Sequence, residues 1–172
     1  MSDGLPGRAV DGSTDGEAVD RAHLAEAVRL AEENVGAGGG PFGAVVVLDG
    51  DVVATGQNRV TRDNDPTAHA EVVAIRAACA DLATFSLAGA TLYSSCEPCP
   101  LCLAASLWAR LDRVVFAADR HDAARGGFDD RAFYDLFAAD RATWDVPVQH
   151  LPTPDGSRPF DAWLDAAGRT HY

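Results

Sequence analysis

The first clear pattern of hydrophobic and polar positions in the chain is helical. Beyond residue 20, apolar side chains recur every three or four residues, at Leu24, Val28, Ala31 and Val35. This spacing places them on one face of a helix. Gly36 follows, and glycine readily adopts the backbone that ends a helix. The pattern therefore predicts a helix over residues 21–36.

A β-hairpin is predicted next. Two runs rich in β-branched residues, 43–48 and 52–56, lie on either side of Asp49-Gly50. An Asp-Gly pair suits the tight turn between antiparallel strands, because both residues tolerate a positive φ. These two segments should therefore pair as adjacent antiparallel strands.

Helices and strands then alternate along the chain. Asp65-Pro66 is a typical helix start, because Asp can cap free backbone amides and Pro suits the first helical position. It predicts a helix that reaches about residue 80. The next segments are a buried strand over 90–94, a helix over 101–110 and a strand over 113–117. This alternation favours an α/β layered fold whose later strands run parallel.

The ends of the chain carry weaker patterns. Residues 1–20 contain few large apolar side chains, so we expect a mobile acidic arm there. Aromatic residues after Gly126 suggest a helix, residues 146–151 a strand, and residues 160–172 a short helix with a tail. The length of 172 residues fits one domain, over residues 21–172.

Composition narrows the functional classes. The net charge is −12, from 14 Lys and Arg against 26 Asp and Glu, and such an acidic protein repels polyphosphates. No apolar stretch approaches the ~20 residues of a membrane span, and the N-terminus lacks the pattern of a signal peptide. We therefore expect a soluble, cytoplasmic protein that binds neither nucleic acid nor membranes.

The strongest chemical signal is a set of metal-binding residue types. His69-Ala-Glu71 is followed by Pro-Cys99-Pro-Leu-Cys102, which is the His-x-Glu and Pro-Cys-x-x-Cys signature of zinc deaminases. Cys99 and Cys102 are three residues apart on a predicted helix, so both sulfurs can bind one tetrahedral Zn²⁺, with His69 as third ligand. One coordination position then stays open for water.

Glu71 has a different predicted role. Two residues along a helix correspond to a rotation of ~200°, so Glu71 cannot face the metal as His69 does. Two thiolates cancel the charge of Zn²⁺, and the ion then acidifies its water less than it would with neutral histidines alone. We therefore expect Glu71 to take a proton from the attacking water and to return it to the departing amine.

A closed structural zinc site is the alternative. Cys96 lies three residues before Cys99, so Cys96, Cys99, Cys102 and His69 could form a Cys₃His site with no open position. We favour the open site, because the closed one leaves Glu71 without a role.

Further motifs extend the pattern beyond the metal ligands. They are Gly-Pro-Phe-Gly-Ala-Val at 40–45, Gly-Gln-Asn at 56–58, Asn-Asp-Pro-Thr-Ala-His-Ala-Glu at 64–71, Ser-Cys-Glu-Pro-Cys-Pro at 95–100 and Gly-Phe-Asp-Asp at 127–130. With these motifs, residues 21–172 resemble the bacterial guanine deaminases, within the cytidine deaminase-like superfamily. The last motif separates that family from the transfer-RNA adenosine deaminases, which share the zinc residues.

The resemblance implies a fold and an assembly. It implies a three-layer α/β/α cytidine deaminase-like fold with a mixed sheet of about five strands and one catalytic zinc per subunit. It also implies a domain-swapped homodimer, in which the C-terminal segment of one subunit, here residues 160–172, covers the active site of its partner.

The resemblance also implies the residues that contact the substrate. Asn58 and Asp130 would hold the purine, Phe42 would pack against it, and Tyr172 would close the pocket. Guanine presents O6 and N7 acceptors beside an N1–H donor, which suits an amide and a carboxylate. Each position also has a structural interpretation: Asn58 as a turn residue, Phe42 as a core residue and Asp130 as a helix cap.

Several functions compete at this point. The resemblance implies hydrolytic deamination of guanine to xanthine and ammonia. The alternatives are deamination of another aminopurine, nucleoside or aminotriazine, deamination of adenosine in transfer RNA, and a non-catalytic interaction domain stabilised by zinc. Transfer RNA would require several phosphate contacts, which the net charge of −12 disfavours.

Overall fold

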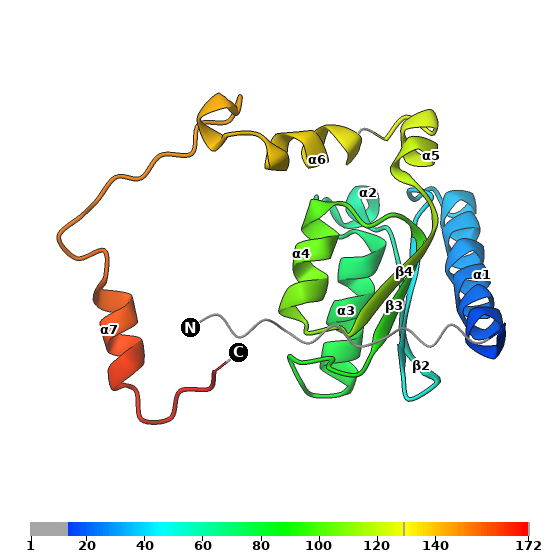
Figure 1. Cartoon of the computed structure of the whole chain (residues 1–172), viewed down its shortest axis with the longest axis horizontal. Helices are drawn as coiled ribbons and strands as arrows, with labels where there is room; N and C mark the ends of the chain where they lie inside the picture. Colours follow the sequence, from blue (N-terminus) through cyan, green and yellow to red (C-terminus); the bar gives the residue numbers. More distant parts are fainter. Residues whose placement is uncertain (1–13, 129, 172) are drawn as a thin grey trace.

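The central sheet has four strands in the computed structural model, which describes residues 14–128 and 130–171 (Figure 1). The strands are β1 (Gly43–Leu48), β2 (Asp51–Gln57), β3 (Thr91–Cys96) and β4 (Arg113–Ala118). Their order across the sheet is β2-β1-β3-β4. β1 runs antiparallel to both β2 and β3, whereas β3 and β4 are parallel. This mixed sheet between helices confirms the predicted α/β/α fold class.

The β1–β2 hairpin turns where the sequence predicts. Asp49 and Gly50 have φ values of 54° and 89°, and Leu48 pairs directly with Asp51. Two successive residues with positive φ give a turn whose twist matches that of the flanking strands. The Asp-Gly pair therefore fixes the register next to the turn, as far as the shift between Val46 and Val47.

Helices cover both faces of the sheet, with α1 (Thr14–Gly36) on one face and with α3 (Ala70–Asp81) and α4 (Pro100–Trp108) on the other (Figure 1). Successive side chains of β1 point to opposite faces. Val45 and Val47 pack with α1, whereas Ala44 and Val46 pack in the core beneath α3. Burial on both faces explains why β1 is apolar throughout instead of alternating with polar residues.

Two glycines let these helices approach the sheet closely. A Cβ atom at Gly43 would lie 2.3 Å from the carbonyl oxygen of Ala27 in α1. A Cβ atom at Gly56 would lie 2.1 Å from the carbonyl oxygen of Ala70 in α3. Since any side chain at Gly56 would push α3 outward, this glycine holds the N-terminus of α3 against β2. His69 directly precedes that N-terminus.

The first helix begins earlier than its apolar pattern predicts. α1 starts at Thr14, so residues 14–20, which we expected in a mobile arm, form its first turns. Asp20 accepts hydrogen bonds from the Tyr93 hydroxyl (2.7 Å) and from Arg113 Nη1 (2.8 Å), on β3 and β4. These distant polar partners stabilise the start of the helix, and an apolar pattern does not reveal them. Residues 1–13 of the predicted arm lie outside the described residues.

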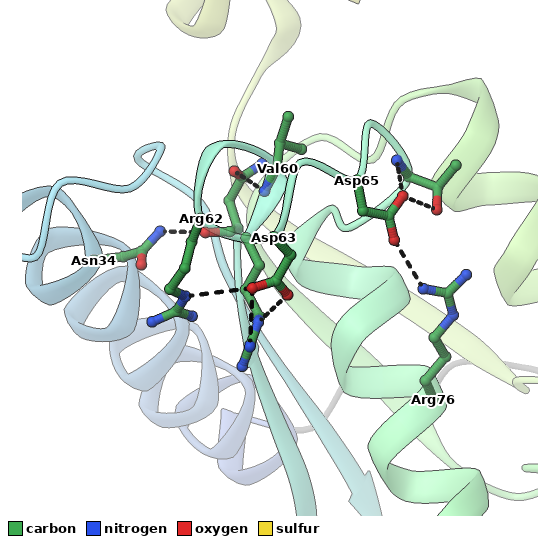
Figure 2. A network of polar contacts seen from close by, with 9 residues as sticks. Asn34, Val60, Arg62, Asp63, Asp65 and Arg76 are labelled. Atoms are coloured by element: carbon green, nitrogen blue, oxygen red, sulfur yellow. Dashed lines mark hydrogen bonds and ion pairs between the residues drawn. The ribbon is translucent and has the colours of Figure 1, made fainter.

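The helix that carries Glu71 begins later than predicted. Asp65 does not cap it, because Asp65 Oδ1 accepts a hydrogen bond from the backbone amide of Thr67 (2.8 Å) within the preceding loop. Asp65 Oδ2 also forms an ion pair with Arg76 Nη1 at 3.5 Å, and Figure 2 shows the two side chains turned toward each other. α3 therefore starts at Ala70, and His69 becomes its N-cap residue with an extended backbone.

The apolar pattern misses some of the short helices and predicts a strand that does not form, whereas the helices that it suggests after Gly126 and near residue 160 are both present. The remaining helices are α2 (Val60–Asp63), α5 (Arg120–Arg125), α6 (Asp130–Ala138), the 3-10 helix η1 (Arg141–Thr143) and α7 (Arg158–Asp165). Residues 146–151 pair with no strand of the sheet and are exposed. Among the helices within 14–128 and 130–171, none is long and apolar enough to cross a membrane.

Replacing Asp20 with asparagine should weaken the docking of α1. The variant loses charge-assisted hydrogen bonds to Arg113, so we expect the free energy of unfolding at pH 7 to fall by about 1.5–3 kcal/mol. Hydrogen bonding to Arg113 lowers the pKa of Asp20. The stabilisation is thus present above the unfolded pKa of ~3.9 and is lost as the pH falls through the lower folded value.

Chemical denaturation at pH 7 and at pH 3 measures this effect. The difference between Asp20→Asn and the parent protein should be largest at pH 7 and should shrink at pH 3. Equal stability of the two proteins at pH 7 would show that the contact does not stabilise the helix start.

Candidate functional site

Three side chains with metal-binding atoms meet where α3 and α4 begin. His69 is the N-cap residue of α3, Cys99 is the N-cap residue of α4, and Cys102 lies in the first turn of α4. His69 Nδ1 lies 3.5 Å from each sulfur, and the two sulfurs are 3.7 Å apart. Around a tetrahedral zinc ion, two sulfurs would be about 3.8 Å apart and a sulfur and a nitrogen about 3.6 Å apart. The three atoms therefore fit one zinc ion.

The electrostatics of the cluster favour a thiolate at Cys99, whereas the hydrogen bond with Cys99 and burial raise the pKa of Cys102. Hydrogen bonding with Cys102, assisted by His69, lowers the pKa of Cys99 to about 4 against the opposing effect of burial. Cys99 also lies at a helix N-terminus, where free backbone amides favour negative charge. The Cys99 thiolate is therefore present at neutral pH and ready to bind a cation.

Glu71 lies in the first turn of α3, beside the cluster. Its side chain is buried, and Oε1 accepts a hydrogen bond from Ser94 Oγ at 3.3 Å. Burial raises the pKa of Glu71, so this carboxyl group takes up a proton more readily than an exposed glutamate does. A group of this kind can accept a proton and later release it, as general acid–base catalysis requires.

Cys96 points away from the metal-binding atoms. Its sulfur donates a hydrogen bond to the carbonyl oxygen of Asp119 at 3.6 Å. Within the part of the chain that the structure describes, the group of close ligand atoms comprises His69, Cys99 and Cys102. This geometry argues against the closed Cys₃His alternative, and it leaves one tetrahedral position for a ligand that is not a side chain.

A cavity of about 350 Å³ opens onto the cluster. Its wall brings together five residues that the sequence singles out: Phe42, Asn58, His69, Glu71 and Cys99. The volume lies at the lower end of the range for small-molecule sites. The cavity therefore combines metal ligands, a buried carboxyl group and one primary amide in a space suited to a small ligand.

The other two predicted substrate contacts have side chains outside the described part of the chain. Asp130 is the first residue of α6, and its side chain lies outside the described part of the chain. It comes two residues after Phe128, which lines the cavity. Tyr172 also lies outside the described residues. The roles of Asp130 and Tyr172 therefore stay predictions.

Asn58 is held in place by a buried asparagine of α1. Asn34 Nδ2 donates hydrogen bonds to the carbonyl oxygens of Gly40 (2.7 Å) and Asn58 (2.8 Å). Figure 2 shows the amide of Asn34 turned toward the segment that precedes Val60. Asn58 Oδ1 accepts a hydrogen bond from the Val60 amide (3.3 Å), so its NH₂ group stays available for a ligand. The apolar pattern hides Asn34, although its place three residues after Ala31 puts it on the buried helix face.

Two more residues of the cavity wall are not among the predicted site residues. Phe128 packs edge-to-face against Phe42, with ring centroids 4.8 Å apart, and extends the apolar side of the cavity. Glu97 contributes a carboxylate two residues before Cys99. Both residues lie within the sequence motifs 95–100 and 127–130, which are the available signal for them.

The segment that contains the cluster matches a known protein family. Residues 17–118 match the zinc-binding region of the cytidine and deoxycytidylate deaminases. The chain belongs to this family. The predicted zinc cofactor and cytidine deaminase-like fold are confirmed, and the cluster of His69, Cys99 and Cys102 can hold the zinc ion of this deaminase domain.

Other deaminases resemble the chain over different lengths. It is 49% identical to guanine deaminase of Bacillus subtilis (strain 168) over 150 residues, which are 87% of this chain and 96% of that relative. A crystal structure of the Bacillus subtilis guanine deaminase superposes with a TM-score of 0.85 and 48% identity, covering 88% of this chain and 98% of that one. Guanine deaminase from Nitrosomonas europaea gives a TM-score of 0.60 at 30% identity, covering 76% and 79%. The tRNA-specific adenosine deaminase of Bacillus subtilis is 39% identical over 99 residues, 58% of this chain and 62% of that relative.

Removal of either thiol ligand should cost this deaminase its zinc. We expect Cys99→Ser and Cys102→Ser to contain far less than one zinc ion per chain and to unfold at lower temperature, because metal binding and folding are coupled. Cys96→Ser is the matched control, since it removes a buried thiol from the same segment outside the cluster. Metal analysis of the purified variants measures the outcome. Equal zinc loss in Cys96→Ser and Cys99→Ser would favour the closed structural site.

Proposed function

We propose that the chain catalyses the zinc-dependent hydrolytic deamination of guanine to xanthine and ammonia. The observation that carries this proposal is the similarity to Bacillus subtilis guanine deaminase, because it extends over 96% of that protein. It therefore includes residues beyond 118, where the zinc-binding region ends. By contrast, the match to the tRNA-specific adenosine deaminase covers 62% of that relative.

The cavity has the chemistry that a free purine base requires. Phe42 and Phe128 supply an apolar wall for the flat ring. The free NH₂ group of Asn58 can donate to O6 or N7 of guanine, both of which are acceptors. Asp130, at the start of α6, would accept the N1–H. An acidic surface, with a net charge of −12, fits a free base better than a polyphosphate.

In the proposed reaction, Glu71 moves the proton. His69, Cys99 and Cys102 would hold the zinc ion, which when bound would acidify the water molecule that serves as nucleophile. Glu71 takes a proton as the water oxygen attacks C2, the carbon of guanine that bears the exocyclic amine. The same carboxyl group then gives a proton to the departing nitrogen, which leaves as ammonia. Burial of Glu71 supports the first of these steps, because a raised pKa makes protonation of its carboxylate easier.

A panel of substrates tests the proposed function. Ammonia release should be measured from guanine, other aminopurines, nucleosides, an aminotriazine and transfer RNA, each at the same enzyme concentration. We expect the highest kcat/KM with guanine. Preferential release from transfer RNA would replace the proposal with the tRNA alternative, and no release from any substrate would favour the non-catalytic zinc domain.

Glu71→Gln should separate chemistry from binding. The amide keeps the size of the side chain but cannot accept the proton, so turnover of guanine should fall by about 10²–10⁴-fold. Zinc content and unfolding temperature should stay near those of the parent protein, because Glu71 is outside the ligand cluster. Steady-state kinetics with metal analysis on the same preparation measure both. Turnover close to the parent value would exclude Glu71 as the proton carrier.

The state of the cysteines suits the cytoplasm, where we place the enzyme. Cys79, Cys96, Cys99 and Cys102 carry thiols rather than disulfides. Disulfides form mainly in oxidising compartments, whereas the cytosol keeps thiols reduced and available to zinc.

We infer that a second copy of the chain covers the C-terminal segment. Large apolar side chains of this segment are exposed, among them Phe160 (70%) and Leu164 (62%), and so is Leu151 (85%) in the stretch that leads to it. Figure 1 shows α7 standing apart from the sheet and from the helices that cover it. An apolar surface of this kind is typical of a protein interface. A domain-swapped homodimer would bury it.

The receptor for this segment would lie beside the zinc site. A second cavity, of about 440 Å³, adjoins His69 and Cys99 and is lined largely by apolar side chains such as Leu101 and Phe137. In the proposed dimer, residues 160–172 of one subunit form a lid over the site of the other, and Tyr172 closes the pocket. A lid of this kind excludes water and positions the base.

A mixing experiment tests the lid. Deletion of residues 169–172 should reduce turnover while zinc content stays unchanged. Mixed dimers of Glu71→Gln chains and tail-deleted chains should regain activity, because one site then combines an intact Glu71 with an intact tail. Full activity after deletion would show that there is no lid. Confirmed mixed dimers without recovered activity would show that the tail acts within its own subunit.

A further inference from the structure

An ion pair holds the segment that precedes the zinc ligand Cys99. The carboxylate of Glu97 accepts three hydrogen bonds from Arg120, the N-terminal residue of α5: from the backbone amide (3.0 Å), from Nε (2.9 Å) and from Nη2. The backbone amide of Glu97 donates to the carbonyl oxygen of Ala118 (2.8 Å). Both the backbone and the side chain of Glu97 are therefore fixed from the β4–α5 connection.

A tyrosine of α6 holds the same segment from a second direction. The guanidinium carbon of Arg120 lies 3.6 Å from the ring centroid of Tyr134, a cation–π contact. The Tyr134 hydroxyl donates a hydrogen bond to the carbonyl oxygen of Pro98, whose side chain is fully buried. Glu97 and Pro98, the two residues directly before Cys99, are thus both attached to residues of α5 and α6.

We propose that Arg120 is a positioning residue of the zinc site, which acts with Tyr134 to fix the turn 97–99 and couples the Cys99 ligand to α6. Partners of metal ligands tune metal affinity because they orient the ligand atoms. A planar guanidinium suits this role, since it pairs with a carboxylate through two nitrogens and stacks on an aromatic ring at the same time. The inference concerns the zinc site and does not depend on which base is deaminated.

A second arginine–carboxylate pair of the chain serves as a control, because it stabilises the fold away from the zinc site. Arg113 also pairs with a carboxylate, that of Asp20, through two nitrogens. The two pairs are similarly exposed, with side-chain values of 36% and 16% for Arg113 and Asp20 and 33% and 15% for Arg120 and Glu97. Arg113 and Asp20, however, join α1 to β4, and their hydrogen bonds involve none of the three zinc ligands. Loss of either pair should lower stability, but only loss of the Arg120 pair should disturb the zinc.

Transfer of zinc from the loaded protein to an excess of the chelator 4-(2-pyridylazo)resorcinol tests the proposal. Arg120→Met removes the guanidinium and should speed the transfer about 10- to 100-fold. Tyr134→Phe removes only the hydroxyl and should give a smaller increase, which keeps the test available if Arg120→Met folds poorly. Arg113→Met should lower the unfolding temperature and leave the transfer rate unchanged. In cobalt-substituted protein, Arg120→Met should also shift the thiolate-to-cobalt absorption bands.

Two results would overturn the proposal. One is zinc transfer from both Arg120→Met and Tyr134→Phe at the parent rate. The other is that Arg113→Met and Arg120→Met lower the unfolding temperature equally and also release zinc at the same rate. Faster zinc transfer would then follow from a general loss of stability. Adding Glu97→Gln to Arg120→Met should not speed the transfer further, because the two residues act as one unit. If the two substitutions instead multiply each other's effect on the transfer rate, Glu97 and Arg120 act independently and the proposed pair is contradicted.

Discussion

His69 and Cys99 can share one metal ion only because α3 and α4 begin at the same place, each with a metal ligand as its N-cap residue. The absence of a side chain at Gly56 allows α3 to lie against β2 at the required depth. The same placement puts Glu71 in the first turn of α3, where it is buried beside Ser94 of β3. It also directs two helix N-termini toward the metal, where their free amides favour thiolate.

The parts of the fold that could be predicted have local signals. Asp49-Gly50 fixes a hairpin through the backbone preferences of its own two residues, and the long helices show in the spacing of apolar side chains. The start of α1 could not be predicted this way, because its stabilising partners on β3 and β4 are far away in the sequence. The start of α3 was misplaced because Asp65 has two possible partners, and it binds the Thr67 amide instead of capping a helix.

The candidate site likewise contains residues that the sequence reveals and residues that it does not. Its metal ligands are recognisable because the chemistry demands fixed residue types at fixed spacing. Asn34 and Arg120 carry no such signal, because each acts on a segment 23 or more residues away: Asn34 on Asn58, and Arg120 on Glu97. Such residues become visible only when the fold brings distant segments together. Sequence therefore identifies the groups that perform chemistry more readily than the groups that hold them in place.

The ion pair between Asp20 and Arg113 also affects the order in which the protein folds as it leaves the ribosome. The two residues are 93 positions apart. The start of α1 is synthesised early, yet its polar partners exist only after β3 and β4 have emerged and paired. Contacts of such long sequence separation form late, because the entropy of closing the intervening chain must be overcome first. The polar contacts of the first turns of α1 therefore form only after β4 has been synthesised, although this end of the helix is made early.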